Sequence, residues 1–271
     1  MNHAGDPDAL RRDWMQMSNI EGKVALVAGG GSGIGEAIAI AFAANGVRVV
    51  VSDLRVDMAE NVAALIKSSG GDAIALAMDV SQQADIDRAM NKTISIYGQI
   101  DMLVNSAGFI SPQPLTEAGI DVWRKSFEVN VEGALLLART ALPHLRKSDI
   151  ASVVNISSLA GASAFPNGGS YGSSKAALIQ LSQTMGIEWA EHGVRVNVIN
   201  PGAIRTPLLI EALPEATQKS VVQRIPMKRM GVPREIADLA LFLCSPAASY
   251  ITAQQICCDG GRSQALMADL D

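Results

Sequence analysis

The alternation of short aliphatic runs with longer amphipathic segments is the feature that most constrains the fold of this chain. From Lys23 onward, brief runs of valine, isoleucine, leucine and alanine are separated by segments whose apolar residues recur about every 3.6 positions. This pattern is typical of consecutive β-α-β units, in which helices cover a parallel sheet on both faces. Strands are predicted at 24–27, 47–51, 73–78, 102–104, 153–156, 194–199 and 255–258, and helices from Gly33 and near 57–68, 82–96, 118–147, 170–191 and 234–244. The sequence therefore predicts an α/β fold with seven parallel strands.

Length and composition favour one large domain. Of the 271 residues, 48% are hydrophobic but only 4% aromatic, so the apolar content is small and aliphatic, as close helix-on-sheet packing requires. No internal repeat or low-complexity linker marks a second domain. We expect an N-terminal arm over 1–20 and a single domain over 21–271. Within it, the segment 203–231 lacks strand character and follows the carboxyl end of a predicted strand, where open α/β sheets bind ligands, so it is a candidate substrate lid.

Charge and cysteine usage exclude several classes of function. Lys and Arg number 22 against 27 Asp and Glu, giving a net charge of −5 without a basic run, so nucleic acid is not an expected partner. The longest apolar stretch, 37–44, is far shorter than the roughly 18–20 residues that span a bilayer, so no membrane is expected either. Cys244, Cys257 and Cys258 fit neither a disulfide framework nor metal-ligand spacing, and no metal is predicted. With no signal-peptide pattern at the N-terminus, the sequence indicates a soluble, cytoplasmic protein.

A glycine-rich turn follows the first predicted strand and opens the first predicted helix. Small residues there let a pyrophosphate approach the backbone N–H groups of the helix N-terminus, where the helix dipole also favours negative charge. The positions expected to bind the cofactor are Gly29, Gly31, Ser32, Gly33, Ile34 and Gly35. A glycine cluster alone also fits a tight turn without a ligand. The order of strand, glycines and helix favours a Rossmann-type, doubly wound domain that binds a dinucleotide.

Asp53 ends the second predicted strand, eighteen positions after Gly35. This is near the offset of about 20 residues expected for the acid that accepts hydrogen bonds from an adenosine ribose. A carboxylate there opposes a 2′-phosphate, because like charges about 4 Å apart at an effective dielectric of about 20 repel by about 4 kcal/mol. The alternatives are that Asp53 only caps the next helix and that nearby Arg55 recruits a phosphate. No basic residue lies in the glycine turn, and we predict NAD as the cofactor.

Tyr171 and Lys175 are four positions apart, which on a helix places both side chains on one face. An isolated pair of this kind usually belongs to an amphipathic surface. Here it follows a predicted strand that ends in Ser157 and Ser158, so the tyrosine begins a helix beside a strand's carboxyl end. A phenol with a pKa near 10 becomes a useful base only if its pKa approaches about 7, which a neighbouring ammonium and a positive nicotinamide ring could together achieve. Lys175 is the predicted ammonium.

Several short motifs follow one another along the chain. They are AGGGSGIG at 28–35, NSAG at 105–108, Asn130 within VNVEG, Ser158, YGSSK at 171–175 and NPG at 200–202. With these motifs in this order, the sequence resembles the short-chain dehydrogenases/reductases over about residues 20–261. The resemblance implies that Asn130, Ser158, Tyr171 and Lys175 are catalytic, with Asn130 in a proton relay. It implies further cofactor contacts at Leu54, Asp79, Val80, Asn105, Ser106, Ala107, Gly108, Tyr171, Lys175, Pro201, Gly202, Ile204 and Thr206. It implies substrate contacts at Ser158, Ala160, Phe165, Tyr171 and Leu208, and assembly as a homotetramer or homodimer.

Three positions depart from the family pattern. Ala28 stands where the family usually has threonine, and Ser106 where it has the second asparagine of NNAG. Both departures remove polar groups that in the family brace the strands around the site, so we expect altered local stability rather than loss of activity. Ala253 replaces a glycine near the C-terminus.

These features predict an NAD(H)-dependent oxidoreductase that interconverts a secondary alcohol and a ketone, with Tyr171 as general acid/base. The substrate is expected to be small to medium-sized and partly apolar or cyclic, because apolar residues occur in 203–231 and after Ser158. One alternative is a regulatory protein on the same fold that binds NAD(H) without chemistry. A second alternative is a 3-ketoacyl reductase. It is disfavoured because carrier-protein-dependent ketoacyl reductases often have an arginine just before the glutamate of the helix that carries the tyrosine, whereas this chain reads Gly186-Ile187-Glu188. A third is a lyase or epimerase, which usually has a longer chain.

Overall fold

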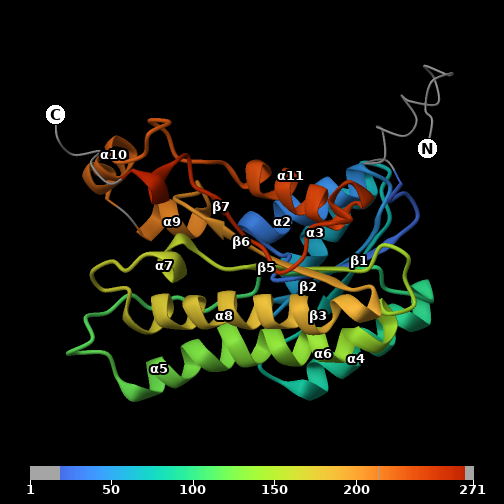
Figure 1. Cartoon of the computed structure of the whole chain (residues 1–271). Coiled ribbons are helices and arrows are strands. Elements are labelled where there is room, and N and C mark those ends of the chain that lie inside the picture. Colours follow the sequence, from blue (N-terminus) through green and yellow to red (C-terminus); the bar gives the residue numbers. More distant parts are fainter. Residues whose placement is uncertain (1–18, 213, 266–271) are drawn as a thin grey trace, which may run out of the picture.

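A parallel sheet of seven strands forms the centre of the molecule (Figure 1). The computed structural model describes residues 19–212 and 214–265, without the side chains of residues 208 and 212. The strands follow the order β3-β2-β1-β4-β5-β6-β7. Their bounds are β1 Val24–Ala28, β2 Arg48–Asp53, β3 Ala73–Ala77, β4 Met102–Asn105, β5 Ser152–Ile156, β6 Arg195–Pro201 and β7 Gln255–Cys258. The predicted α/β class, the Rossmann-type winding and the seven strands are confirmed.

Helices cover both faces of the sheet, as the aliphatic strands require. On one face lie α2 (Gly33–Ala44), α3 (Val56–Ser68) and α11 (Pro233–Cys244). On the other lie α4 (Gln83–Tyr97), α6 (Gly133–Leu145) and α8 (Gly169–Glu188). Alternate strand residues enter two separate apolar clusters, for example Val27 on the first face and Leu26 on the second. This alternation, together with the helical periodicity, is why the sequence specified the layers so fully.

The predicted helix over 118–147 is not continuous. It consists of α5 (Ile120–Phe127), a π-helical turn η2 (Glu128–Glu132), and α6. A π turn adds a residue to the helical repeat and is common at functional sites. Asn130 lies in this turn and is fully buried. Periodicity alone reads through such a turn because the apolar pattern on either side remains helical.

The segment 203–231 contains two helices, α9 (Pro207–Ala212) and α10 (Glu215–Gln223), rather than extended loop. Its two ends are joined, since Ile204 and Gly231 form a β-bridge and the Arg205 N–H donates to the Gly231 carbonyl at 2.9 Å. The remaining short helices are α7 (Leu159–Ala162), η3 (Ala190–His192), η4 (Pro246–Ala248) and η5 (Arg262–Gln264). Among the described residues, no helix is long and apolar enough to cross a membrane.

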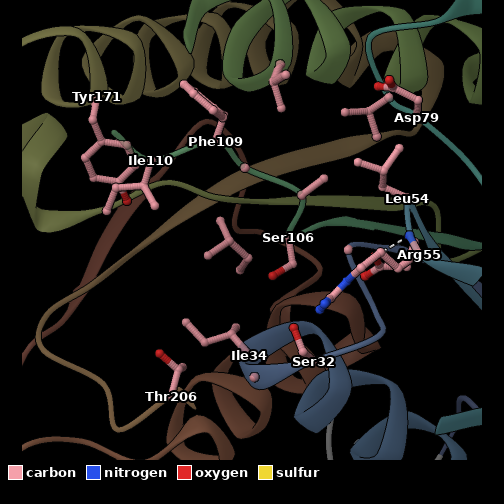
Figure 2. Close-up of a pocket in the computed structure, with 18 of the residues that line it drawn as sticks. Ser32, Ile34, Leu54, Arg55, Asp79, Ser106, Phe109, Ile110, Tyr171 and Thr206 are labelled. Carbon is pink, nitrogen blue, oxygen red and sulfur yellow. Dashed lines mark hydrogen bonds between the residues drawn. The ribbon is translucent and has the colours of Figure 1, made fainter. Parts of the chain in front are cut away.

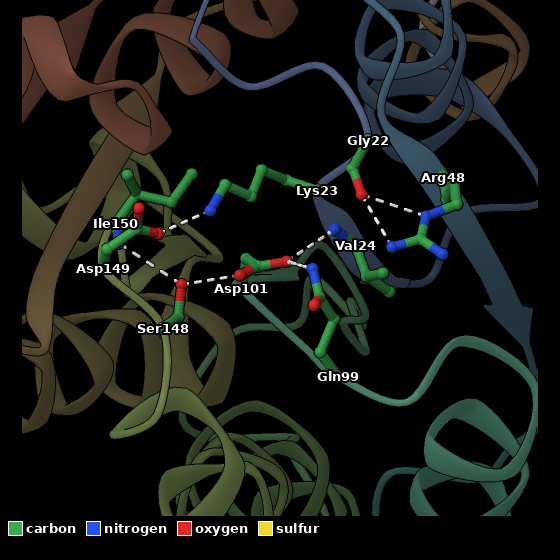
Figure 3. A network of polar contacts seen from close by, with 9 residues as sticks. All are labelled: Gly22, Lys23, Val24, Arg48, Gln99, Asp101, Ser148, Asp149 and Ile150. Carbon is green, nitrogen blue, oxygen red and sulfur yellow. Dashed lines mark hydrogen bonds and ion pairs between the residues drawn. The ribbon is translucent and has the colours of Figure 1, made fainter.

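A polar network ties together the amino ends of β1 and β4 and the loop before β5 (Figure 3). The buried Asp101 carboxylate accepts hydrogen bonds from the Val24 N–H at 2.7 Å, the Gln99 amide at 2.7 Å and the Ser148 hydroxyl at 2.6 Å. The position of Asp101 at an element boundary suggests a helix cap, but in the structure its carboxylate connects strands instead.

Ile20, the last residue of the predicted N-terminal arm, is fully buried against the first core cluster.

Candidate active site

A cavity of about 560 Å³ opens at the carboxyl ends of the strands, where the strand order reverses between β1 and β4 (Figure 2). Open α/β sheets bind ligands at such a switch point. Predicted residues that line it are Gly29, Ser32, Gly33, Ile34, Asp53, Leu54, Asp79, Val80, Ser106, Ala107, Gly108, Tyr171, Lys175 and Thr206. Segments that lie far apart along the chain thus line one cavity.

The glycine turn leaves no room for side chains. A Cβ atom on Gly29 would lie 2.6 Å from the Ala107 nitrogen, and one on Gly35 would lie 1.9 Å from the Gly29 carbonyl oxygen. Gly29 also has a φ of +70°, a conformation that favours glycine. Gly35 packs α2 against the turn and does not line the cavity. The bare backbone at the start of α2 is therefore an open cradle that fits the pyrophosphate of a dinucleotide.

Asp53 is held in place by two backbone donors. One carboxylate oxygen accepts the Gly31 N–H at 3.0 Å, and the other accepts the Arg55 N–H at 3.1 Å. Each oxygen keeps a lone pair for a further donor, and the side chain lines the cavity. A ribose diol fits this acceptor. The Arg55 side chain extends over the cavity toward Ser32 (Figure 2).

The Lys175 ammonium is buried beneath the cavity, with the side chain 4% exposed. It donates to the Ile156 carbonyl at 2.9 Å and lies 5.9 Å from the centre of the Tyr171 ring. The Ser157 hydroxyl donates to the Lys175 carbonyl at 2.9 Å, which fastens α8 to the end of β5. Ser158 caps α7, its hydroxyl oxygen accepting the Ala160 N–H at 3.1 Å. The Tyr171 phenol and the Lys175 ammonium thus line the same cavity, and the Ser158 side chain lies within hydrogen-bonding reach of the phenol.

Burial dominates the ionisation of both groups on α8. It lowers the pKa of Lys175 from 10.5 to about 8, because the ammonium loses water. Burial also raises the pKa of Tyr171, and the hydrogen bond with Ser158 opposes this rise only in part. In the chain by itself the pKa of Tyr171 is therefore raised, contrary to the expected effect of Lys175. That expectation also invoked the positive ring of a bound nicotinamide, which is not part of the chain.

Asn130 lies behind the cavity wall and not on it. Its side-chain oxygen accepts the Phe109 N–H at 2.7 Å, while its amide nitrogen donates to the Phe109 carbonyl at 2.9 Å and to the Ser174 hydroxyl at 2.9 Å. Three of the four hydrogen bonds that this amide can make thus hold the loop after β4 against α8.

Several other predicted residues also lie outside the cavity lining. Asn105 and Pro201 are buried at strand ends, Gly202 packs on Asp259, and Ile204 is 5% exposed in the bridge to Gly231. Gly31 contacts Asp53 instead of the open space. Ser158, Ala160 and Phe165 lie in the segment between β5 and α8, and the side chain of Leu208 falls outside the described part of the chain.

The cavity has other lining residues that were not among the predicted site residues, which are Arg55, Met78, Phe109, Ile110, Lys125, Val129, Ile156, Ser157 and Pro207. From the sequence, Arg55 is only an alternative phosphate ligand. Most of these residues directly follow or precede a predicted site residue, so adjacency was a usable signal. Lys125 carried no such signal, because the approach of α5 to the cavity depends on tertiary packing.

Comparison with known proteins places the chain in a family. A sequence profile described as "Enoyl-(Acyl carrier protein) reductase" matches residues 28–263. The 2,5-dichloro-2,5-cyclohexadiene-1,4-diol dehydrogenase of Sphingobium indicum is 40% identical over 91% of this chain and 98% of its own length. The 7alpha-hydroxysteroid dehydrogenase of Escherichia coli is 38% identical over 91% of this chain and 96% of its own. A solved 7 alpha-hydroxysteroid dehydrogenase, in complex with NADH and 7-oxo glycochenodeoxycholic acid, superposes with a TM-score of 0.86 at 37% identity, covering 89% and 94% of the two chains.

These similarities extend over nearly the whole domain and include the glycine turn, the Asn130 turn and the Tyr171 helix. Together with the parallel sheet and the cavity at its switch point, they show that the chain belongs to the short-chain dehydrogenase/reductase family.

Proposed function

We propose that this protein is an NAD(H)-dependent oxidoreductase that interconverts a secondary alcohol and a ketone. The observation that carries the proposal is one shared cavity, with Leu54, Arg55 and Asp79 at one end and Tyr171 at the other (Figure 2). Asp53, which precedes Leu54, and Lys175, one helical turn after Tyr171, line the same cavity. A binding protein without chemistry would need only the first end. The NADH complex of the superposed 7 alpha-hydroxysteroid dehydrogenase supports the choice of cofactor.

The site residues divide the chemistry between them. Ser158 and Tyr171 hydrogen-bond to the substrate oxygen. During oxidation the Tyr171 phenolate takes the hydroxyl proton and becomes the phenol, and during reduction the phenol gives that proton to the substrate oxygen and becomes the phenolate. Lys175 stays cationic below its pKa of about 8 and stabilises the phenolate that forms. Asn130 keeps the loop after β4 in register with α8. Bound NAD supplies the hydride acceptor or donor.

The cofactor end favours NAD over NADP. The Gly31 and Arg55 N–H groups fix the Asp53 carboxylate at the cavity wall, where it accepts hydrogen bonds from a ribose diol and repels a 2′-phosphate. The other cofactor contacts proposed from the sequence that line the cavity lie just after the strands β1 to β4, at Thr206 and on α8. Those that do not line it, such as Gly35 and Gly202, act by shaping the backbone.

The substrate end is apolar. Phe165 leaves 45% of its surface exposed, and its ring covers Gly168, one helical turn before Tyr171; a Cβ on Gly168 would lie 2.5 Å from the ring. Ala160 and Leu208 are the other proposed apolar contacts, with α9 and α10 forming the lid over 203–231. An alcohol on a partly apolar or cyclic skeleton of small to medium size fits such a wall. The names of the two relatives above refer to cyclic diols and steroids.

We further propose a cytoplasmic homotetramer, with a homodimer as the alternative. Tyr250 is fully exposed and Ile187 at the end of α8 is 72% exposed, so both side chains are available for a contact between subunits. Light scattering of the purified protein tests the assembly.

Replacing Tyr171 with phenylalanine tests the function. Turnover of a panel of secondary alcohols and ketones should fall at least a thousandfold on loss of the general acid/base, within the usual range of about 10²–10⁴. The fluorescence change on NADH binding should remain, since the glycine turn and Asp53 are untouched. Wild-type turnover in the Tyr171→Phe variant would refute the mechanism.

An acyl-carrier reductase is the second candidate, because the matching profile carries that description and a relative 36% identical is a 3-oxoacyl-[acyl-carrier-protein] reductase of Thermotoga maritima. Comparing kcat/KM for a 3-ketoacyl thioester with that for a cyclic ketone separates the two. Preference for the thioester would establish this candidate.

A further inference from the structure

An isoleucine absent from the sequence-based site projects into the cavity beside the catalytic tyrosine. Ile110 lies in the loop between β4 and α5 and lines the same cavity as Tyr171 (Figure 2). Its side chain is 42% exposed, although it is large and aliphatic. We propose that Ile110 is a specificity-determining residue, whose side chain contacts the carbon skeleton of the substrate and favours compact cyclic alcohols. The inference rests on the alcohol and ketone chemistry proposed above.

The backbone beside Ile110 is fixed by hydrogen bonds with a buried side chain. Both the N–H and the carbonyl of Phe109 are hydrogen-bonded to the side-chain amide of Asn130, at 2.7 and 2.9 Å. The same amide donates to the Ser174 hydroxyl, which belongs to the residue before Lys175. The position of Ile110 is therefore coupled through one buried side chain to the helix that carries the catalytic groups.

A firmly held β-branched residue makes a shape-selective wall. The two substituents on the Cβ of isoleucine restrict its χ1 angle, so the side chain has few other rotamers with which to accommodate substrates of different shape. A ring offers a fixed apolar face to such a wall and loses little conformational entropy on binding, whereas an open chain must be ordered. Contact with the exposed part of Ile110 then favours the ring.

The position of Ile110 in the cavity favours substrate over cofactor as its partner. In Figure 2, Ile110 and Tyr171 lie at one end of the cavity, and Leu54, Arg55 and Asp79 lie at the other. The adenosine end is thus separate from Ile110. The reacting oxygen must reach Tyr171, so the carbon atoms attached to it come close to the isoleucine.

The test compares the wild type with Ile110→Val and Ile110→Ala. The measured quantity is the ratio of kcat/KM for cyclohexanol to that for butan-2-ol, with NADH affinity measured separately by fluorescence titration. We expect the ratio to fall about three- to tenfold in Ile110→Ala and by a smaller factor in Ile110→Val, because contact area with the ring is lost. The dissociation constant of NADH should stay within twofold of the wild type.

Ile96→Ala is the matched control, since Ile96 on α4 is similarly exposed, at 44%, and does not line the cavity. Its ratio should equal that of the wild type. A ratio unchanged within twofold in Ile110→Ala would overturn the inference while leaving the proposed function intact. Weaker NADH binding in step with the loss of activity would also overturn it, by assigning Ile110 to the cofactor. If the wild type oxidised neither alcohol, nor any other in a broad panel, the proposed function would fail and the inference with it.

Discussion

A threonine at position 28 should make this protein more stable than a valine there does, and the structure indicates why. The side-chain oxygen of Asn105 is buried and has no hydrogen-bond partner among the described residues. Ala28 lies directly opposite Asn105 in the β1–β4 register, on the face of the sheet covered by α4, α6 and α8. Neighbouring strands are about 4.8 Å apart, so a hydroxyl on residue 28 can reach the Asn105 oxygen.

The expected magnitude follows from the cost of leaving a buried acceptor without a donor, about 1–3 kcal/mol. The site is fully buried, so the two added heavy atoms also carry a packing cost. Valine has the same shape as threonine without the hydroxyl, so Ala28→Val carries the same packing cost. The difference between Ala28→Thr and Ala28→Val isolates the hydrogen bond, and we expect about 1–2 kcal/mol in favour of threonine.

Urea unfolding at a fixed protein concentration, followed by circular dichroism, measures this difference as a shift in midpoint at constant slope. In thermal unfolding, it corresponds to about 2–4 °C in Tm for each kcal/mol. In an Asn105→Ala background the order should reverse in favour of valine, because the buried threonine hydroxyl then has lost its acceptor. If the Asn105 oxygen does not accept a hydrogen bond from residue 28, the buried threonine hydroxyl costs free energy and the valine variant is the more stable one. That order of stabilities would refute the reasoning.

Three further predictions concern separate features of the chain. Ala253 has a φ of +57°, a conformation that costs a residue with a Cβ about 1–2 kcal/mol, so Ala253→Gly should raise the free energy of unfolding by up to about 1 kcal/mol. The control Ala64→Gly in α3 should lower the free energy of unfolding by about 1 kcal/mol. Equal effects of the two substitutions in urea unfolding would contradict this prediction. Burial lowers the pKa of Lys175 from 10.5 to about 8, so between these pH values the unfolded chain binds more protons than the folded chain. The free energy of unfolding should therefore rise by about 2 kcal/mol from pH 8 to pH 10. Lys175→Met should flatten this rise when denaturation is measured across that pH range. Asp53→Asn removes the charge that opposes a 2′-phosphate, and the preference for NAD over NADP in kcat/KM should fall tenfold or more; an unchanged ratio would assign cofactor choice to another residue.

The sequence specified the layers and the location of the site because both depend on local patterns. Alternating aliphatic runs and helical periodicity predicted the seven strands and the long helices, with bounds differing by one or two residues at most strand ends. The glycine turn, Asp53 and Tyr171 each follow or begin an element at the carboxyl edge of the sheet. Parallel strands bring such edges together, so the amino-acid sequence by itself assigns these residues to one site.

The tertiary structure alone decided how the groups at that site interact. The π turn at Asn130 and the use of its amide to hold Phe109 depend on contacts between segments about twenty residues apart, which no local periodicity records. The approach of Lys125 and Ile110 to the cavity has the same origin. The sequence suggested that Lys175 would help to lower the pKa of Tyr171, whereas the folded chain buries both groups and burial raises that pKa. Spacing fixes which side chains share a helix face, but desolvation depends on everything packed around them, and only the folded chain determines that.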